Sequence, residues 1–441
     1  MIRRLLRIAL LPSLVCPGAW ADDPVGAEFQ VNTFTTGVQE GATAAQAANG
    51  SFVVAWTSGR GNANQDGSYT GVFGQRFDAS GAPQGSEFQV NSYTTGDQRG
   101  AAVAADASGN FVVVWSSGKL WGTVVSGQDG SSAGVFGQRF DASGVPQGGE
   151  FQVNSYTTGA QASPRVACGA NGDFVVVWSS AGQDGSIDGV FGQRFDASGV
   201  PQGGEFQVNS HTPYSQRLGD VASDARGNFV VVWTSELQDG SSQGVFGRRY
   251  NALGIPQGSE FQVNSYTTGN QAGPAVASNA KGDFVVVWRS RHQDGSGSGI
   301  FGQRFDAVAL PRGSEFQVNS YTTGEQGVAS VGADATGNFV VVWDSDGQDG
   351  SGYGIFGQHF NALGAPLGSE FHVNSYTSGA QRFPRVASGA SGGSVAVWSS
   401  YGQDGSENGV FGQRYGDIVF RDGFEGSARG PWAEPPSGRL N

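Results

Sequence analysis

The chain has 441 residues and a formal net charge of −13, and 73 of its residues are glycine. The acidic balance excludes the basic face of a nucleic-acid-binding protein, so no nucleic-acid partner is expected. The glycines follow no Gly-X-Y period, which excludes collagen, and 11% aromatic residues supply enough core material to argue against a disordered chain.

The first residues have the features of a secretory signal. A start with several arginines precedes an apolar run at residues 8–15, and Ala19-Trp20-Ala21 matches an A-x-A cleavage site. We therefore expect residues 1–21 to be removed on export, which places the mature protein in the periplasm, at the cell surface or outside the cell. No later stretch reaches the ~18 apolar residues that a membrane span needs, so none is expected.

After the signal, the motif Glu-Phe-Gln-Val-Asn opens a repeat with a period of about 55 residues. Its first residues are Glu28, Glu87, Glu150, Glu205, Glu260, Glu315 and Glu370. Each unit also contains a run close to Phe-Val-Val-Val-Trp, whose consecutive apolar, largely β-branched residues suit a strand buried on both faces. These runs end at Trp56, Trp115, Trp178, Trp233, Trp288, Trp343 and Trp398.

The third unit illustrates the strands expected in every unit. Strand a covers residues 164–168, strand b 174–178, strand c 190–195 and strand d 205–209. Asn171-Gly172 between a and b predicts a tight hairpin, and short polar turns link the other strands. Because short connections join antiparallel neighbours, each unit is predicted to be a four-stranded antiparallel meander.

Strand c alternates large and small residues. Phe191 and Phe195 share one face, and Gly192 leaves space on the other. We expect the tryptophan that ends strand b of a neighbouring unit to fill this space. The arginine represented by Arg194 is expected to brace strands or units rather than to bind a ligand.

Repeated four-stranded units predict an all-β fold, a seven-bladed β-propeller. The chain begins on a d strand, residues 28–32, and its last unit ends on a c strand, residues 410–415. The N-terminal strand can therefore complete the last blade and close the ring. An open β-solenoid is the alternative. The expected divisions are a signal peptide at 1–21, the propeller at 22–415 and a C-terminal tail at 416–441.

Two sets of residues carry a family resemblance. Phe-Gly-Gln-Arg-Phe-Asp-Ala-Ser-Gly (191–199), Glu-Phe-Gln-Val-Asn (205–209) and Gly-Gln-Asp-Gly-Ser (182–186) resemble a tandem repeat of large secreted and surface-attached bacterial proteins, some of them adhesin-like with calcium-binding modules. This likeness implies an extracellular repeat protein. The tail segment 418–425, Ile-Val-Phe-Arg-Asp-Gly-Phe-Glu, resembles a short C-terminal motif of exported Gram-negative proteins, which implies sorting or surface retention; a strand docked on the propeller rim is the alternative.

In a propeller of this kind, the d–a and b–c loops emerge on one face. Here these loops carry Asn-Ser-Tyr-Thr-Thr-Gly-x-Gln and Gln-Asp-Gly-Ser, so we expect a ligand on that face. The candidate ligand-binding residues are Tyr156, Gln161, Gln183, Asp184, Ser186, Gln238, Asp239, Tyr321, Gln326, Gln348 and Asp349.

The loop aspartates are also candidate calcium ligands, and no other cofactor is indicated. They are Asp129, Asp184, Asp239, Asp294, Asp349 and Asp404. Each loop offers one carboxylate, whereas calcium takes six to eight oxygens. The alternative is that the aspartates shape turns, that the glutamines tie the d–a crossing to the next blade, and that the tyrosines pack beneath their own loops.

Signs of catalysis are weak. Gly-x-Ser-x-Gly patterns at 130–134, 240–244 and 389–393 lie in turns and lack the strand–elbow–helix context of a nucleophile. We therefore expect no enzyme but a monomeric, exported binding scaffold for a glycan or a surface protein. The alternatives are a purely structural repeat protein of the cell surface or matrix, and a hydrolase or lyase with a site on the deviating first, second and fourth blades.

Overall fold

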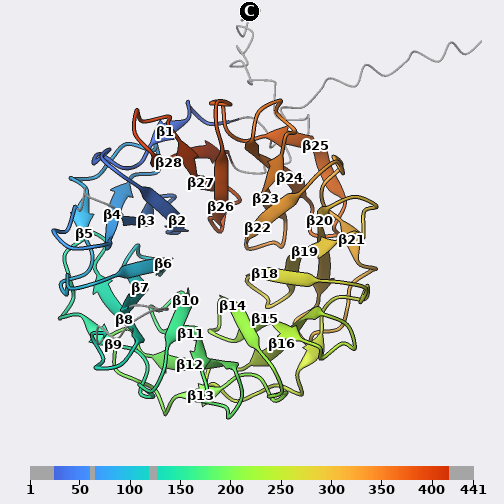
Figure 1. Cartoon of the computed structure of the whole chain (residues 1–441), viewed down its shortest axis with the longest axis horizontal. Coiled ribbons are helices and arrows are strands. Elements are labelled where there is room, and N and C mark those ends of the chain that lie inside the picture. Colours follow the sequence, from blue (N-terminus) through green and yellow to red (C-terminus); the bar gives the residue numbers. More distant parts are fainter. Residues whose placement is uncertain (1–23, 60–64, 119–126, 417–441) are drawn as a thin grey trace, which may run out of the picture.

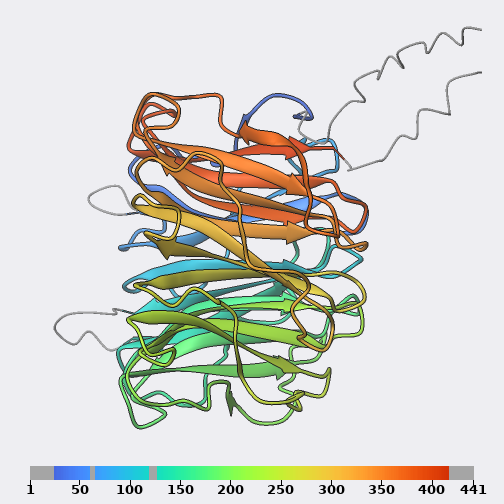
Figure 2. The same ribbon diagram turned by 90° about the vertical axis from the view of Figure 1, so that its right-hand side faces the viewer.

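The computed structural model describes residues 24–59, 65–118 and 127–416. Every regular element in these ranges is a β-strand, and the strands form seven four-stranded antiparallel sheets. The sheets stand around a central axis as propeller blades, and the strands run between the two faces of the ring (Figures 1 and 2). The predicted seven-bladed propeller is confirmed. The signal segment and the tail motif lie outside the described residues.

Strands a and b form the inner half of each blade. The a strands are β2 (Gln39–Gln46), β6 (Gln98–Ala105), β10 (Gln161–Cys168), β14 (Gln216–Ser223), β18 (Gln271–Ser278), β22 (Gln326–Ala333) and β26 (Gln381–Ser388). The b strands are β3 (Phe52–Ser58), β7 (Phe111–Gly118), β11 (Phe174–Ala181), β15 (Phe229–Glu236), β19 (Phe284–Arg291), β23 (Phe339–Asp346) and β27 (Ser394–Tyr401).

Strands c and d form the outer half, and blades are numbered here from the one that contains β2. The c strands are β4 (Gly71–Phe77), β8 (Ala133–Phe140), β12 (Asp188–Phe195), β16 (Gln243–Tyr250), β20 (Ser298–Phe305), β24 (Tyr353–Phe360) and β28 (Asn408–Tyr415). The d strands are β5 (Phe88–Gln89), β9 (Phe151–Gln152), β13 (Phe206–Gln207), β17 (Phe261–Gln262), β21 (Phe316–Gln317), β25 (Pro366–His372) and, for blade 7, β1 (Phe29–Gln30). Among the described residues no helix is long and apolar enough to cross a membrane.

The ring closes as expected, through the N-terminal strand. β1 pairs with β28 in the registers Phe29↔Gly412 and Gln30↔Phe411. Closure by residues far apart in sequence leaves blade 7 with the same four strands as the other blades. β1 is shorter than the predicted strand at 28–32, because only Phe29 and Gln30 of this Glu-Phe-Gln-Val-Asn motif pair with β28 before the chain crosses to the next blade.

The core consists of interfaces between blades. In β15, Phe229, Val231 and Trp233 point to blade 3, where they pack against Val175 and Val177. The alternate residues Val230 and Val232 point to blade 5. Each b strand is therefore buried on both faces, as the unbroken apolar run predicted. All seven tryptophans named above are fully buried at such junctions.

The space above the c-strand glycine is filled differently from the prediction. A side chain at Gly192 would meet the ring of Phe206, from strand d of the same blade, at 2.7 Å. Trp233, the tryptophan of the neighbouring blade, packs at the same junction between blades 3 and 4. It does not fill this space, because the three atoms nearest to a side chain at Gly192 all belong to Phe206. The phenylalanine of Glu-Phe-Gln-Val-Asn thus packs across strand c.

The c-strand arginine braces neighbouring blades, as expected. Nη1 of Arg139 donates a hydrogen bond to the carbonyl oxygen of Ala197 in blade 3 at 2.7 Å. Its Nη2 donates one to the carbonyl oxygen of Gln147 in its own blade at 3.0 Å. Blade 6 carries His359 instead, which stacks on Phe371 at 5.1 Å. Burial lowers the pKa of His359 to about 4, so the imidazole is neutral at pH 7.

Replacing Trp288 by Ala should lower the free energy of unfolding by roughly 3–5 kcal/mol, because it opens a cavity between blades 4 and 5. Urea denaturation measures the loss. Leu253→Ala is the control, since Leu253 is 69% exposed and its loss should stay below about 0.5 kcal/mol. A loss below about 1 kcal/mol for Trp288→Ala would contradict this packing.

Replacing Gly192 by Ala should destabilise the protein by roughly 1–3 kcal/mol, because the added methyl group collides with the Phe206 ring. Gly149→Ala is the matched control, since nothing lies within 4 Å of a methyl group there. Equal denaturation midpoints for the two variants would show that Phe206 can move aside.

Candidate functional site

The d–a and b–c loops share one face, here called the crossing face. Ser186, in the b–c loop of blade 3, donates Oγ to the carbonyl oxygen of Tyr214 in the next d–a loop at 3.0 Å. A bridge pairs Asp188 with Ser215 beside it. The opposite face, here called the hairpin face, carries the a–b and c–d turns.

A three-residue clasp uses most of the polar groups on the crossing face. Oε1 of Glu205 accepts a hydrogen bond from Nε2 of Gln183 at 2.5 Å. Oε2 of Glu205 accepts hydrogen bonds from the backbone N–H and the Oγ–H of Ser155 at 2.6 and 2.8 Å. This role of the glutamate was not predicted from the sequence. The seven Gln–Glu pairs are Gln65–Glu87, Gln128–Glu150, Gln183–Glu205, Gln238–Glu260, Gln293–Glu315, Gln348–Glu370 and Gln403–Glu28. The candidate ligands Gln183, Gln238 and Gln348 therefore hold the framework.

Gln161 and Gln326 are both 0% exposed, so in this structure neither presents its side chain to a ligand on the crossing face. Gln161 accepts Nδ2 of Asn154 at 3.2 Å and donates Nε2 to the Thr158 carbonyl at 3.0 Å. Asn154 in turn accepts the N–H of Val135 in blade 2 at 2.7 Å. This network ties the d–a crossing to both blades, which was the alternative interpretation of the glutamines.

Asp184 shapes its turn. Its Oδ1 accepts the N–H of Ser186 at 3.0 Å, and its Oδ2 accepts Nδ2 of Asn209 at 3.3 Å. The carboxylate lies against Gly189, where a side chain would come within 2.6 Å of Oδ2. Asp239 makes the same contacts in blade 4. Within the described ranges no three His, Cys, Asp or Glu residues are grouped so as to hold a metal ion.

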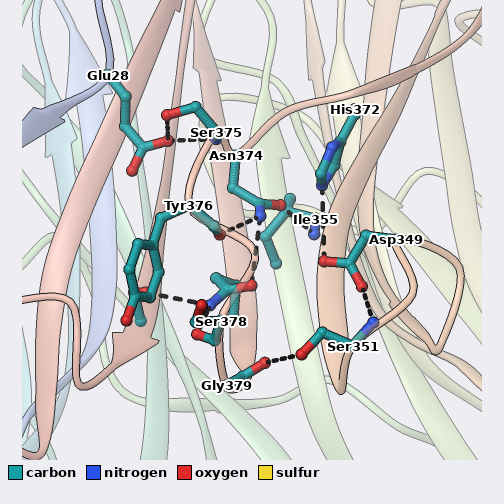
Figure 3. A network of polar contacts seen from close by, with 12 residues as sticks. Glu28, Asp349, Ser351, Ile355, His372, Asn374, Ser375, Tyr376, Ser378 and Gly379 are labelled. Carbon is teal, nitrogen blue, oxygen red and sulfur yellow. Dashed lines mark hydrogen bonds and ion pairs between the residues drawn. The ribbon is translucent and has the colours of Figure 1, made fainter.

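Figure 3 shows the crossing face where blades 6 and 7 meet. The side-chain oxygen of Asn374 accepts a hydrogen bond from the N–H of Ile355 at 2.6 Å, and the Glu28 carboxylate accepts one from the N–H of Ser375. His372 replaces the usual glutamine of its motif, and its Nε2 lies 3.9 Å from Oδ2 of Asp349. Asp349 also accepts the N–H of Ser351, so it belongs to the same turn network.

Tyr156 and Tyr321 are half-buried in the d–a loops of two separate blades. Their carbonyl oxygens accept Nδ2 of Asn154 and Asn319, both at 2.9 Å. The structure thus distributes the predicted residues around the ring, one set per blade, and does not bring them together into one cavity.

The hairpin face contains clefts between neighbouring blades, which sequence analysis did not predict. The cleft between blades 2 and 3 has a volume of about 260 Å³ and is lined by Asp106, Phe111, Arg139 and Phe174 among others. Similar clefts lie between blades 1 and 2, 4 and 5, and 5 and 6, with volumes of about 230, 220 and 450 Å³. The c-strand arginine and phenylalanines from both blades line all four clefts.

The cleft between blades 5 and 6 is the largest of these four. Arg304 and Arg312 line one side, Asn279 and Asp283 contribute polar groups, and Leu363 stands at the rim with 79% exposure. Burial lowers the pKa of Arg304, and the nearby Arg312 lowers it further. Arg312 pairs with Asp306 at 3.1 Å and keeps most of its side chain exposed.

Cys168 lines the cleft between blades 2 and 3. Burial raises the pKa of its thiol to about 12, and Asp106 and Asp173 add to the shift. The side chain is therefore a thiol at physiological pH and a poor nucleophile.

One junction on the crossing face departs from the repeat. Asp344 stands at the end of β23, where other blades carry Ser, Thr or Arg, and its side chain is 0% exposed. It accepts the N–H of Val328 at 3.0 Å and of Phe383 at 3.3 Å, and Nε of Arg382 lies 3.6 Å away. The guanidinium carbon of Arg382 lies 4.0 Å from the Tyr353 ring centroid. Burial raises the pKa of Asp344, and this effect outweighs the hydrogen bonds and the Arg382 charge, which act to lower it.

Repeat alignment contains a signal for this junction, because Asp344 is the only acidic residue at its position in the seven units. The clefts left no such signal, because they arise where the turns of two blades meet.

No family model and no curated protein matches this sequence. Among solved structures, a protein of unknown function from Dyadobacter fermentans aligns at 9% identity with a TM-score of 0.51, over 88% of this chain and 98% of that chain. Hadza microbial sialidase Hz136 aligns at 12% identity with a TM-score of 0.47, over 78% of this chain and 73% of that chain. An α-L-arabinanase from Penicillium chrysogenum aligns at 13% identity with a TM-score of 0.46, over 89% of this chain and 99% of that chain. At these identities the likeness to the first concerns the fold alone.

Replacing Glu28 by Gln should lower the free energy of unfolding by about 1–2 kcal/mol, because an amide cannot accept from both Gln403 and Ser375. Urea denaturation compares it with Glu407→Gln, an exposed position in the b–c loop of the same blade. If both variants unfolded like the parent protein, the clasp would contribute nothing to ring closure.

Proposed function

We propose that this chain is an exported, non-catalytic scaffold that presents repeated clefts on its hairpin face to a glycan. The observation that carries the proposal is the recurrence of one cleft at four blade junctions, with the same kinds of lining residue each time. Repeated equivalent sites suit multivalent binding, in which several weak contacts combine into high avidity.

The hairpin face replaces the crossing face as the proposed contact surface. On the crossing face, the amides of Gln183, Gln238 and Gln348 are held by glutamates and Gln161 is buried. A ligand there would have to break framework hydrogen bonds. The clefts on the opposite face are already formed and open.

The lining residues suit a saccharide. In the cleft between blades 5 and 6, Phe284 and Phe339 line an apolar floor, while the largely exposed guanidinium of Arg312 offers hydrogen-bond donors. Sugars combine an apolar C–H surface with a ring of hydroxyl groups, and a mixture of aromatic and polar groups matches both. The signal-like start and the likeness to adhesin-like repeats support an extracellular encounter with such a partner.

A glycan-array screen of residues 22–441, with calcium and then with chelator, tests the proposal. Binding to a sugar class that survives chelator would support the clefts. Binding that requires calcium would direct attention to the loop aspartates instead. Silence in both screens would contradict glycan binding and favour a protein partner or a purely structural role.

Filling the clefts should abolish the binding. Ala142, Ala197, Ala307 and Ala362 each lie in a c–d turn and line one of the four clefts. Changing all four to Tyr should weaken binding at least about tenfold, while single changes cost less because the other sites remain. Surface plasmon resonance on an immobilised glycan measures the loss.

The matched control is Ser242→Tyr, an equally bulky change at an exposed b–c loop residue on the crossing face. It should leave affinity unchanged. A loss of affinity with Ser242→Tyr, and none with the fourfold variant, would place the contact surface on the crossing face.

A hydrolase is the second candidate, favoured by Asp344, a buried carboxyl group whose pKa burial raises. Incubating any bound glycan with the parent protein and with Asp344→Asn tests this function. New reducing ends formed only by the parent protein would establish it, and none formed by either would favour the scaffold.

A further inference from the structure

The innermost strands have a charge of opposite sign to the whole chain. They contain five arginines and two acidic residues, although the chain has a net charge of −13. These residues are Arg99, Arg165, Arg217, Arg382 and Arg385, with Glu40 and Asp220. Arg217 pairs with Asp188 at 2.7 Å, and Arg382 lies 3.6 Å from Asp344, so these two have carboxylates from neighbouring strands.

Arg165, Asp220 and Arg385 occupy one level of the channel. Each is the fifth residue of its a strand and pairs with the equivalent b-strand valine, in the registers Arg165↔Val177, Asp220↔Val232 and Arg385↔Val397. The a strands of the remaining blades place Thr43, Ala102, Ala275 and Ser330 at this level, all of them uncharged. Two guanidinium groups therefore share one carboxylate there.

The two arginines act on each other across the channel. Arg165 belongs to β10 in blade 3 and Arg385 to β26 in blade 7, and these strands lie on different sides of the central opening (Figure 1). Burial and, to a smaller extent, the charge of Arg165 lower the pKa of Arg385 to about 10, although Asp220 and Asp344 act to raise it. The positive charges thus meet in a partly dehydrated space.

The hydrogen bonds of this cluster leave donors available. Arg165 and Arg385 each donate Nη1 to the carbonyl oxygen of the preceding proline, Pro164 or Pro384, at 2.9 Å. Asp220 accepts the N–H of Val276 from the next blade at 3.0 Å, which holds its carboxylate toward blade 5. A guanidinium has five N–H donors, so each arginine keeps several for another acceptor.

We propose that the axial channel binds one small oxyanion between the guanidinium groups of Arg165 and Arg385. Planar carboxylates and tetrahedral phosphate both match the guanidinium fork, since each presents paired oxygens. An anion at this level neutralises the excess charge and joins blades 3 and 7 through the channel. The site is separate from the clefts, so it stands or fails independently of glycan binding.

Isothermal titration calorimetry tests the proposal with the full chain in a chloride-free buffer at constant ionic strength. Sodium phosphate and sodium acetate serve as separate probes, which distinguishes a tetrahedral oxyanion from a carboxylate. We expect one-site binding of at least one probe, weakened at least tenfold in Arg165→Gln and in Arg385→Gln. Heat from neither probe would overturn the proposal.

Two further variants separate the site from general charge effects and from misfolding. Arg217→Gln removes the same charge from a guanidinium already paired with Asp188, so it should leave anion affinity unchanged. Asp220→Asn removes the competing carboxylate, keeps an oxygen for the Val276 N–H and should tighten binding severalfold. Equal weakening in Arg217→Gln, or weaker binding in Asp220→Asn, would overturn the proposal.

Discussion

Burial of the b strand on both faces is the interaction on which the structure depends. A blade alone would expose both faces of this strand, since in β15 Trp233 points toward blade 3 and Val232 toward blade 5. Stability therefore requires a neighbour on each side, and only a closed ring supplies one to every blade. The pairing of β1 with β28 is a consequence of that requirement.

The clasp shows why residues repeated in every unit need not bind a ligand. The d–a crossing leaves the ladder, so its backbone groups need side-chain partners. Glu205 supplies one acceptor for Ser155, and Asn154 supplies acceptor and donor groups between Val135 and Tyr156. Repetition of such residues follows from repetition of the crossing itself.

The features that could be predicted from the sequence are those that follow from the repeat itself. The period, the apolar runs and the matched chain ends determine blade number, strand order and closure, because these follow from local pattern and burial. The partner of Gly192 was predicted incorrectly, since the choice between Trp233 of the neighbouring blade and Phe206 of the same blade depends on blade twist and spacing. The clefts were missed for a related reason: their walls belong to turns about 55 residues apart that meet only in the ring.

The near-identity of the blades makes the exceptions informative. Asp344 stands where most blades carry a small neutral residue, and there Gly327 leaves space for its carboxylate while Arg382 supplies the opposite charge. Among the described residues, Arg165 and Arg385 have no carboxylate at ion-pair distance, and the charge of Asp220 acts on both of them. The inner strands of non-adjacent blades face one another across the central opening, so a single anion bound there balances charges from both sides of the ring.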